Sequence, residues 1–175
     1  MIFKETKLKD AYTIEIEKKE DERGFFARIW DKDELKSHGL NNKLVQASIS
    51  FSKIKGTLRG LHYQRYPHGE DKLVRVSRGS VYYVIVDLRK KSPTFKENFG
   101  IILSDRNYLM LYVPKGFASG FMTLEVSTEV IYQMSQPYNA NASFGVRWDD
   151  PALAIKWPLK PVLISEKDKN LPYFS

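Results

Sequence analysis

The sequence contains no cysteine among its 175 residues. This absence excludes a disulfide framework, a thiolate nucleophile and any cysteine-ligated zinc or iron–sulfur site. Long apolar runs are also missing, so we expect neither a signal peptide nor a membrane-spanning segment. A cytoplasmic protein without a membrane partner is therefore predicted.

Histidine is scarce, since the chain has only His38, His62 and His68. A metal-binding β-barrel needs several histidines and a carboxylate on facing strands. His38 lies at the end of a predicted helix, and His68 lies in a predicted loop with Glu70 nearby. Neither is expected to face His62. The sequence therefore predicts no metal and no other cofactor.

The positive net charge of +7 raises the question of a nucleic-acid partner. The basic residues are spread along the chain and mixed with acidic ones, as in the segment 15–22. The longest basic cluster, Arg89–Lys91, is expected at a hairpin tip. We therefore predict no nucleic-acid partner. An excess of arginine and lysine also suits a protein that handles phosphorylated small molecules.

Short β-rich segments separated by Gly, Pro, Asn or Asp dominate the sequence. The expected strands are Tyr12–Glu17, Leu44–Phe51, Leu73–Ser77, Val81–Leu88, Ile101–Leu103, Leu109–Val113, Phe121–Leu124 and Glu129–Met134. Arg78–Ser80 reads as a hairpin turn, and only Lys32–Ser37 and Ser165–Asn170 look helical. With no repeat or linker, this pattern predicts one all-β domain over residues 1–175. Such a sandwich, jelly roll or small barrel can hold a ligand at one mouth.

The most informative stretch is Leu58–Gln64, which is followed closely by Lys72–Val76. It places His62 between Arg59 and Lys72. Histidine has an unperturbed pKa near neutrality, so it can take a proton from carbon beside a carbonyl, while a cation holds the developing oxyanion. Taken alone, the stretch also fits a structural histidine in a strand.

Many sequence blocks, in one order along the chain, match a known family. They are Asp21–Phe26, Leu58–Gln64, Lys72–Val76, Val86–Arg89, Ser92–Thr94, Leu103–Ser104, Pro114–Ala118, Trp148–Pro151, Ile155–Pro158 and Leu163–Asp168. With these blocks the chain resembles the dTDP-4-dehydrorhamnose 3,5-epimerase family nearly end to end. The resemblance implies a cupin-like, metal-free jelly roll that forms a homodimer. It also implies exchange of an N-terminal strand, Tyr12–Glu17, between the two copies.

The resemblance further implies a substrate and four catalytic roles. The substrate would be a 4-keto-6-deoxy sugar on a nucleoside diphosphate. His62 would be the base, and Asp168 would orient and charge its imidazole. Lys72 would stabilise the enolate oxygen, and Tyr132 would give a proton to the opposite face. A phenol has a high unperturbed pKa, so nearby cations would help it act.

Further positions would bind the substrate by the same resemblance. Arg23 and Arg59 would hold the diphosphate, a task that suits forked guanidinium groups. Tyr138 would stack on the base, while Gln46 and Lys167 would contact the nucleotide. The remaining expected substrate-binding positions are Phe25, Arg28, Ser48 and Ser119.

Several of these positions depart from the family pattern. The family usually has glutamate at Arg28, Gln-Asp-Asn at Gln46–Ser48, aspartate at Tyr83, histidine at Ser119 and commonly glutamate near Ser143. Ala47 and Ser48 thus replace Asp and Asn. We expect these changes to alter which sugar nucleotide is accepted, with the usual thymidine-linked keto sugar processed poorly.

The sequence therefore predicts a metal-independent epimerase acting at carbon 3, carbon 5 or both, in deoxysugar biosynthesis for surface polysaccharide. One alternative is a single-centre epimerase of a GDP-, CDP- or UDP-linked keto sugar. Another is a homologue that binds a sugar nucleotide without turnover, or a plain β-barrel binding module. Retention of the four residues expected to be catalytic favours the enzyme.

Overall fold

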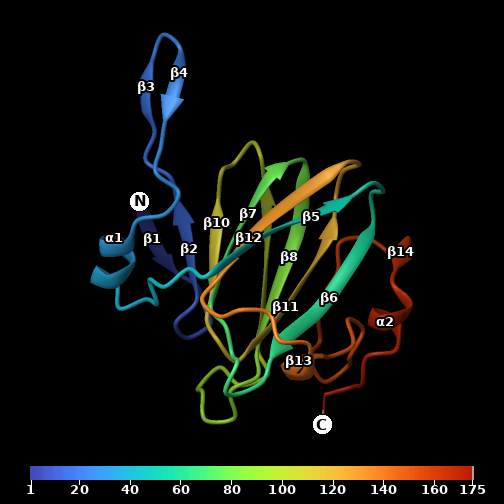
Figure 1. Ribbon diagram of the computed structural model, residues 1–175. Coiled ribbons are helices and arrows are strands. Elements are labelled where there is room, and N and C mark those ends of the chain that lie inside the picture. Colours follow the sequence, from blue (N-terminus) through green and yellow to red (C-terminus); the bar gives the residue numbers. More distant parts are fainter. Residues whose placement is uncertain (175) are drawn as a thin grey trace.

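The computed structural model describes residues 1–174 and places most strands in two facing antiparallel sheets (Figure 1). The first sheet has the order β1 (Ile2–Glu5), β2 (Tyr12–Glu15), β10 (Met110–Val113), β7 (Lys72–Arg78), β12 (Thr128–Met134) and β5 (Gln46–Ser52). The second sheet has the order β13 (Ser143–Gly145), β6 (Thr57–Gln64), β11 (Phe117–Thr123), β8 (Ser80–Asp87) and β9 (Asn98–Ser104). A short strand, β14 (Leu163–Ile164), runs parallel to β6. The all-β prediction is confirmed.

The remaining elements are small. Strands β3 (Lys19–Asp21) and β4 (Gly24–Phe26) form a hairpin that projects away from the sandwich (Figure 1). Helix α1 (Lys32–Ser37), the 3-10 turn η1 (Ala140–Ala142) and helix α2 (Glu166–Lys169) complete the fold. The two predicted helices are confirmed, and neither is long and apolar enough to cross a membrane.

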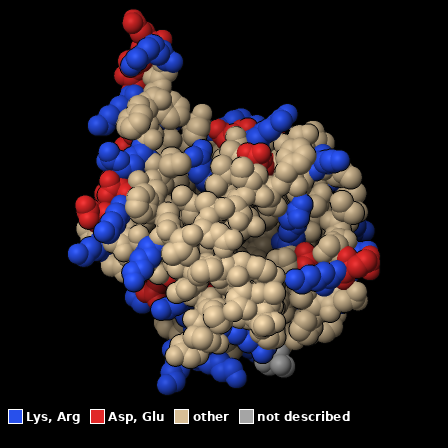
Figure 2. Space-filling model, viewed as in Figure 1, with Lys and Arg blue, Asp and Glu red and all other residues tan. Residues whose placement is uncertain are grey.

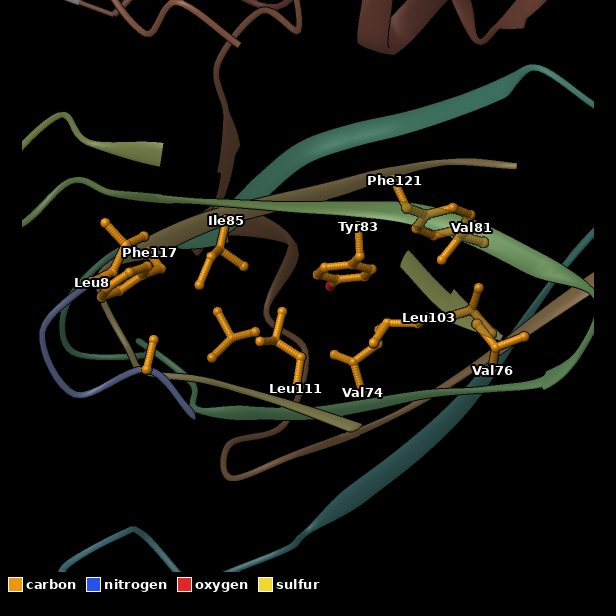
Figure 3. Packing of buried hydrophobic residues seen from close by; sticks show 13 residues of the cluster. Leu8, Val74, Val76, Val81, Tyr83, Ile85, Leu103, Leu111, Phe117 and Phe121 are labelled. Atoms are coloured by element: carbon orange, nitrogen blue, oxygen red, sulfur yellow. The ribbon is translucent and has the colours of Figure 1, made fainter. Parts of the chain in front are cut away.

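A mixed aliphatic and aromatic core joins the two sheets (Figure 3). Val74, Val76 and Leu111 point inward from the first sheet, and Tyr83 and Phe121 meet them from the second. All five are nearly inaccessible to solvent. Burial of each such side chain contributes about 1.5–3 kcal/mol. The core thereby fixes the spacing of the sheets that carry the site.

The predicted hairpin turn at Arg78–Ser80 is wrong, because β7 and β8 belong to different sheets. Gly79 has a φ of +77°, and a Cβ there would lie 2.6 Å from Thr128 Oγ1. Only glycine accepts this backbone conformation and this close approach without strain. The turn is a corner that carries the chain from one sheet to the other.

The predicted exchange of the N-terminal strand Tyr12–Glu17 is also wrong. Strand β2 lies between β1 and β10 of its own chain, with Ile14 opposite both Phe3 and Met110. Both of its edges are hydrogen-bonded, and Ile14 is fully buried. An inner strand of this kind has no free edge to offer a second copy.

The other predicted strands are present with shifted ends. Strand β11 begins at Phe117 rather than Phe121, because the small residues Ala118–Gly120 are buried and show no alternating polarity. Strands β8 and β9 pair with each other, so Arg89–Lys91 lies in their connecting loop, as predicted. The strands most relevant to function are β6, β7 and β12.

Candidate active site

His62 and Asp168 form the central pair of the site. His62 Nε2 lies 2.6 Å from Asp168 Oδ1, and the Gly60 backbone N–H donates to Asp168 Oδ2 at 3.1 Å. Burial alone would raise the pKa of Asp168, but hydrogen bonds from His62, Gly60 and Ser165 together hold this pKa below its ordinary value. The carboxylate can only accept, so Nε2 donates to it and Nδ1 carries the lone pair.

Local sequence explains how this pair is built. His62 lies on β6, and Asp168 lies in α2, where the Ser165 hydroxyl accepts from the Asp168 N–H at 3.1 Å and caps the helix. Gly60 has a φ of +111°, and a Cβ there would lie 2.8 Å from the Gly120 Cα. The close approach of β6 to β11 therefore requires glycine at position 60. The backbone N–H of the same residue donates to Asp168.

A cavity of about 340 Å³ opens beside this pair. Eight predicted site residues line it, namely Arg59, His62, Lys72, Ser119, Tyr132, Tyr138, Lys167 and Asp168. Strand β6 brings His62 from the second sheet, and β12 brings Tyr132 from the first. The two residues expected to transfer protons thus come from opposite walls of one cavity.

The lining of the cavity includes both basic and acidic side chains. Figure 2 shows a largely uncharged face that is hollowed beside a few charged side chains. Lys72 Nζ lies 3.0 Å from Glu70 Oε1 and 3.4 Å from the Ser119 hydroxyl. Lys72 lies on β7 of the first sheet, and its ammonium reaches Ser119 of the second sheet, which stands opposite His62 in the β11–β6 register.

The three histidines are not gathered into a metal site. His38 stacks on Phe3 at 4.0 Å between ring centroids, and His68 Nε2 contacts Asn139 Nδ2 at 3.2 Å. Glu70, which the sequence places near His68, instead contacts Lys72. No group of three or more histidine, aspartate or glutamate side chains within residues 1–174 is arranged to hold a metal ion.

The residues expected to bind nucleotide surround the cavity mouth. The Arg59 side chain donates to the Ser52 hydroxyl at 3.1 Å and to the Phe51 carbonyl at 2.9 Å. Gln46 Oε1 accepts from the Tyr138 N–H at 2.8 Å, which ties the tyrosine to β5. Lys167 comes from α2. Ser48 lies opposite Tyr132 in the β5–β12 register, outside the cavity lining.

Three expected substrate-binding residues lie away from this cavity. Arg23 is on the projecting hairpin, where its side chain is 84% exposed and pairs with Asp21 at 2.6 Å. Phe25 packs edge-on against Tyr108. Arg28 pairs with Asp31 at 3.4 Å and lines a separate small cavity. Within one protomer these three residues therefore lie outside the cavity, and their predicted role in substrate binding stays a prediction.

The departures from the family pattern fall in different places. Tyr83, Ser119 and Ser143 line the cavity, whereas Ala47 is exposed on β5. Tyr83 is buried against Phe121, with ring centroids 6.0 Å apart (Figure 3). Burial raises the pKa of this phenol, so Tyr83 stays neutral at ordinary pH. Three of the changed positions therefore alter the cavity itself.

Several lining residues are not among the predicted site residues, notably Glu70, and Tyr83 is expected only as a departure from the family pattern. The sequence places Glu70 near His68, and it also stands only two positions before Lys72. Because side chains two positions apart in extended chain point the same way, that spacing was the available signal. The position of Tyr83 gives no such signal, because an aromatic residue in a largely buried strand such as β8 is equally expected in the core.

A family model described as dTDP-4-dehydrorhamnose 3,5-epimerase matches residues 5–175. The dTDP-4-dehydrorhamnose 3,5-epimerase of Methanothermobacter thermautotrophicus is 44% identical, over 96% of this chain and 91% of the relative. The Bacillus anthracis dTDP-4-dehydrorhamnose 3,5-epimerase, solved with TDP and PPi bound, is 44% identical with a TM-score of 0.95. That match covers 99% of each chain.

A more distant similarity extends to ChmJ, a 3'-monoepimerase from Streptomyces bikiniensis solved with dTDP-quinovose. It is 27% identical with a TM-score of 0.87, over 96% of this chain and 85% of that one. These structural relatives confirm the predicted jelly-roll fold, and the curated relatives are carbohydrate epimerases. On this evidence, the chain belongs to the dTDP-4-dehydrorhamnose 3,5-epimerase family.

Proposed function

We propose that this protein epimerises a 4-keto-6-deoxy sugar carried on a nucleoside diphosphate, at carbon 3, carbon 5 or both. One observation carries the proposal. His62 and Tyr132 line the same cavity from opposite sheets, and His62 is paired with the buried Asp168 carboxylate. Inversion of a carbon centre requires a proton to leave one face and another to arrive on the opposite face. Two walls with one proton-transfer group each suit that requirement.

The chemistry follows from the substrate. A keto group at carbon 4 acidifies the hydrogens on carbons 3 and 5, because the resulting carbanion is an enolate. His62 Nδ1, which carries the lone pair when Nε2 donates to Asp168, takes the proton. The Lys72 ammonium stabilises the enolate oxygen. The Tyr132 hydroxyl then returns a proton to the other face of the ring.

The mouth of the cavity suits a nucleoside diphosphate. Arg59 and Lys167 supply positive charge for phosphate oxygens, and Tyr138, which is 56% exposed, offers an aromatic face for the base. TDP in the Bacillus anthracis relative supports a thymidine nucleotide. We propose two partners for this protein, the nucleotide-sugar substrate and a second copy of the same chain. A cytoplasmic location and the absence of a nucleic-acid partner stay predictions.

We also propose a homodimer in which the β3–β4 hairpin, not β2, crosses to the second copy. The hairpin projects from the body, and its strands are exposed along their length (Figure 1). Arg23, Phe25 and Arg28 lie on or just after it, so they reach a substrate cavity only in a second copy. Strand β5 forms an edge of the first sheet and exposes Ile49 and Phe51, an apolar surface for such a partner. A monomeric mass by light scattering at micromolar protein would contradict this.

The alternative of single-centre epimerisation has a specific observation in its favour. Tyr83, Ser119 and Ser143 change the cavity lining while the four residues expected to be catalytic remain. ChmJ, a named 3'-monoepimerase, shares the fold. A binding module without turnover has less support, because nucleotide binding alone needs no histidine paired with a buried carboxylate.

Turnover in deuterium oxide tests the function. The protein is incubated with a thymidine-linked 4-keto-6-deoxy sugar, and product is read by mass spectrometry and proton NMR. We expect deuterium at carbon 3, carbon 5 or both, with inverted configuration at each labelled carbon. Two labels indicate a 3,5-epimerase and one label a single-centre enzyme. Absence of label with GDP-, CDP-, UDP- and thymidine-linked substrates would contradict the proposal.

A further inference from the structure

Glu70 and Lys72 form a nearly buried ion pair in the cavity wall. Their charged atoms lie 3.0 Å apart, and their side chains are only 5% and 13% exposed. Lys72 begins β7, and Glu70 stands two residues earlier. The second carboxylate oxygen, Glu70 Oε2, is buried without a hydrogen-bond partner among residues 1–174. Lys72 is therefore the main compensation for this negative charge.

The pair lies beside the proposed base. Lys72 Nζ also contacts the Ser119 hydroxyl at 3.4 Å, and Ser119 pairs with His62 on the neighbouring strand. Glu70 and Ser119 thus restrain the ammonium from two directions. Tyr83 lines the same cavity from β8; a phenol is neutral at ordinary pH, and burial raises the pKa of this one further. It therefore brings no competing negative charge to Lys72.

The location of the pair is unusual for a stabilising contact. Taking two charges out of water costs free energy that their attraction often fails to recover, and apolar residues of similar size are frequently as stable. Other ion pairs of this chain are more exposed, such as Arg106 with Glu125 and Lys169 with Glu166. A buried pair that lines the cavity is better explained by a task there.

We propose that Glu70 is a positioning residue that fixes the Lys72 ammonium where the enolate oxygen develops. This inference rests on the proposed epimerase function. Glu70 acts through Lys72 and not on the substrate. Without the carboxylate, the long and flexible lysine side chain keeps its charge but loses its fixed place, and a displacement of about 1 Å can cost about 100-fold in rate.

A double-mutant cycle tests this coupling. Glu70→Gln, Lys72→Met and the double variant are compared for kcat and KM in the deuterium assay. We expect Glu70→Gln to lower kcat on the order of 10–100-fold with KM little changed. In the Lys72→Met background, the same substitution should cause no further loss. Glu125→Gln, which removes the carboxylate that pairs with Arg106 at the surface, is the matched control and should keep wild-type kcat.

Two results would overturn the inference. One is wild-type kcat in Glu70→Gln, and the other is a loss that multiplies with that of Lys72→Met. If Glu70→Gln does not fold, Glu70→Asp replaces it in the cycle, since it keeps the charge but withdraws it by one methylene. The double variant leaves neither charge unpaired and serves as the folding control.

A second readout needs no turnover. Competitive acetylation followed by mass spectrometry measures how fast the Lys72 amine reacts, and only an unprotonated, accessible amine reacts quickly. We expect Lys72 to react several-fold faster in Glu70→Gln than in the wild type, with Lys169 as internal reference. Equal reactivity would overturn the inference even if the wild type proved inactive on every keto sugar. Failure of the positioning role and failure of the proposed function are thereby told apart.

Discussion

The two walls of the cavity hold their proton-transfer groups by different forces. On the β6 wall, polar contacts fix His62. Its Nε2 lies 2.6 Å from Asp168 Oδ1, and the Gly60 N–H donates to Asp168 Oδ2. On the β12 wall, Tyr132 is held by strand pairing with Ser48 and Val74 and by packing of its ring against the core. Removal of one polar atom should therefore disturb the imidazole, whereas the tyrosine ring should stay in place without its hydroxyl.

The largest expected effect is loss of the base. His62→Ala should abolish both deuterium incorporation and inversion, because a positioned acid or base is worth about 10²–10⁴-fold. His38→Ala is the matched control, since His38 stacks on Phe3 outside the cavity. Deuterium incorporation at the wild-type rate in His62→Ala would assign the base to another group.

Loss of the carboxylate should have the next largest effect. Asp168→Asn should lower kcat on the order of 10–100-fold, because the imidazole loses both orientation and charge stabilisation. It should also destabilise the fold at pH 7 by about 1–3 kcal/mol, the size of a hydrogen bond to a charged group. Denaturant unfolding measures the second effect.

The pH dependence of that stability has a defined sign. The pKa of Asp168 is lowered in the folded state, so its ionised form stabilises the protein above the unfolded pKa of about 3.9. This contribution is lost as the pH falls through the lower folded pKa. The stability gap between wild type and Asp168→Asn should therefore close in acid. Asp149→Asn, which affects a surface carboxylate paired with Arg147, is the control for activity and should leave kcat unchanged.

Much of the cavity wall that carries His62 and Asp168 could be predicted from the sequence. The His62 segment and the capped helix around Asp168 are local patterns, and the family resemblance connects them across the chain. The corner at Gly79 could not be predicted, because a short glycine turn looks the same whether the next strand joins the same sheet or the facing one. Glu70, the buried partner of Lys72, precedes the strand, and its two-residue spacing from Lys72 is its only signal in the sequence.

The hairpin shows the same limit at longer range. Arg23 and Phe25 match the family blocks, yet in one protomer they lie on the projecting β3–β4 hairpin (Figure 1). Sequence similarity indicates that such residues bind substrate. It does not say whether they reach the cavity of their own protomer or that of a second copy. That assignment depends on quaternary structure, which a single chain does not contain.

A smaller effect is expected from the altered cavity lining. Ser119→His adds an imidazole, a possible second cation, beside Lys72 and His62, and should raise kcat/KM for the thymidine-linked keto sugar relative to other nucleotide sugars. A few-fold change is expected, which corresponds to about 1 kcal/mol or less from one added contact. The ratio of kcat/KM values across nucleotide sugars measures it. Efficient wild-type 3,5-epimerisation of the thymidine-linked substrate would show that the departure at Ser119 is neutral.

No effect is expected from metal removal. The proposed chemistry needs only His62, Tyr132 and Lys72 to move or stabilise charge, so EDTA should leave turnover unchanged. Activity is compared before and after dialysis against the chelator. Loss of turnover that a divalent metal restores would require a different mechanism.

The most direct test of proton transfer by His62 and Tyr132 from opposite walls is the ratio of deuterium incorporation to inversion in Tyr132→Phe. The ring should stay packed while the hydroxyl is lost, so His62 should still exchange the proton on its own face. We expect deuterium in the recovered substrate with little or no inverted product, while Tyr66→Phe, at an exposed tyrosine, should behave as wild type. Full inversion in Tyr132→Phe would contradict the account, because the second proton would then come from elsewhere.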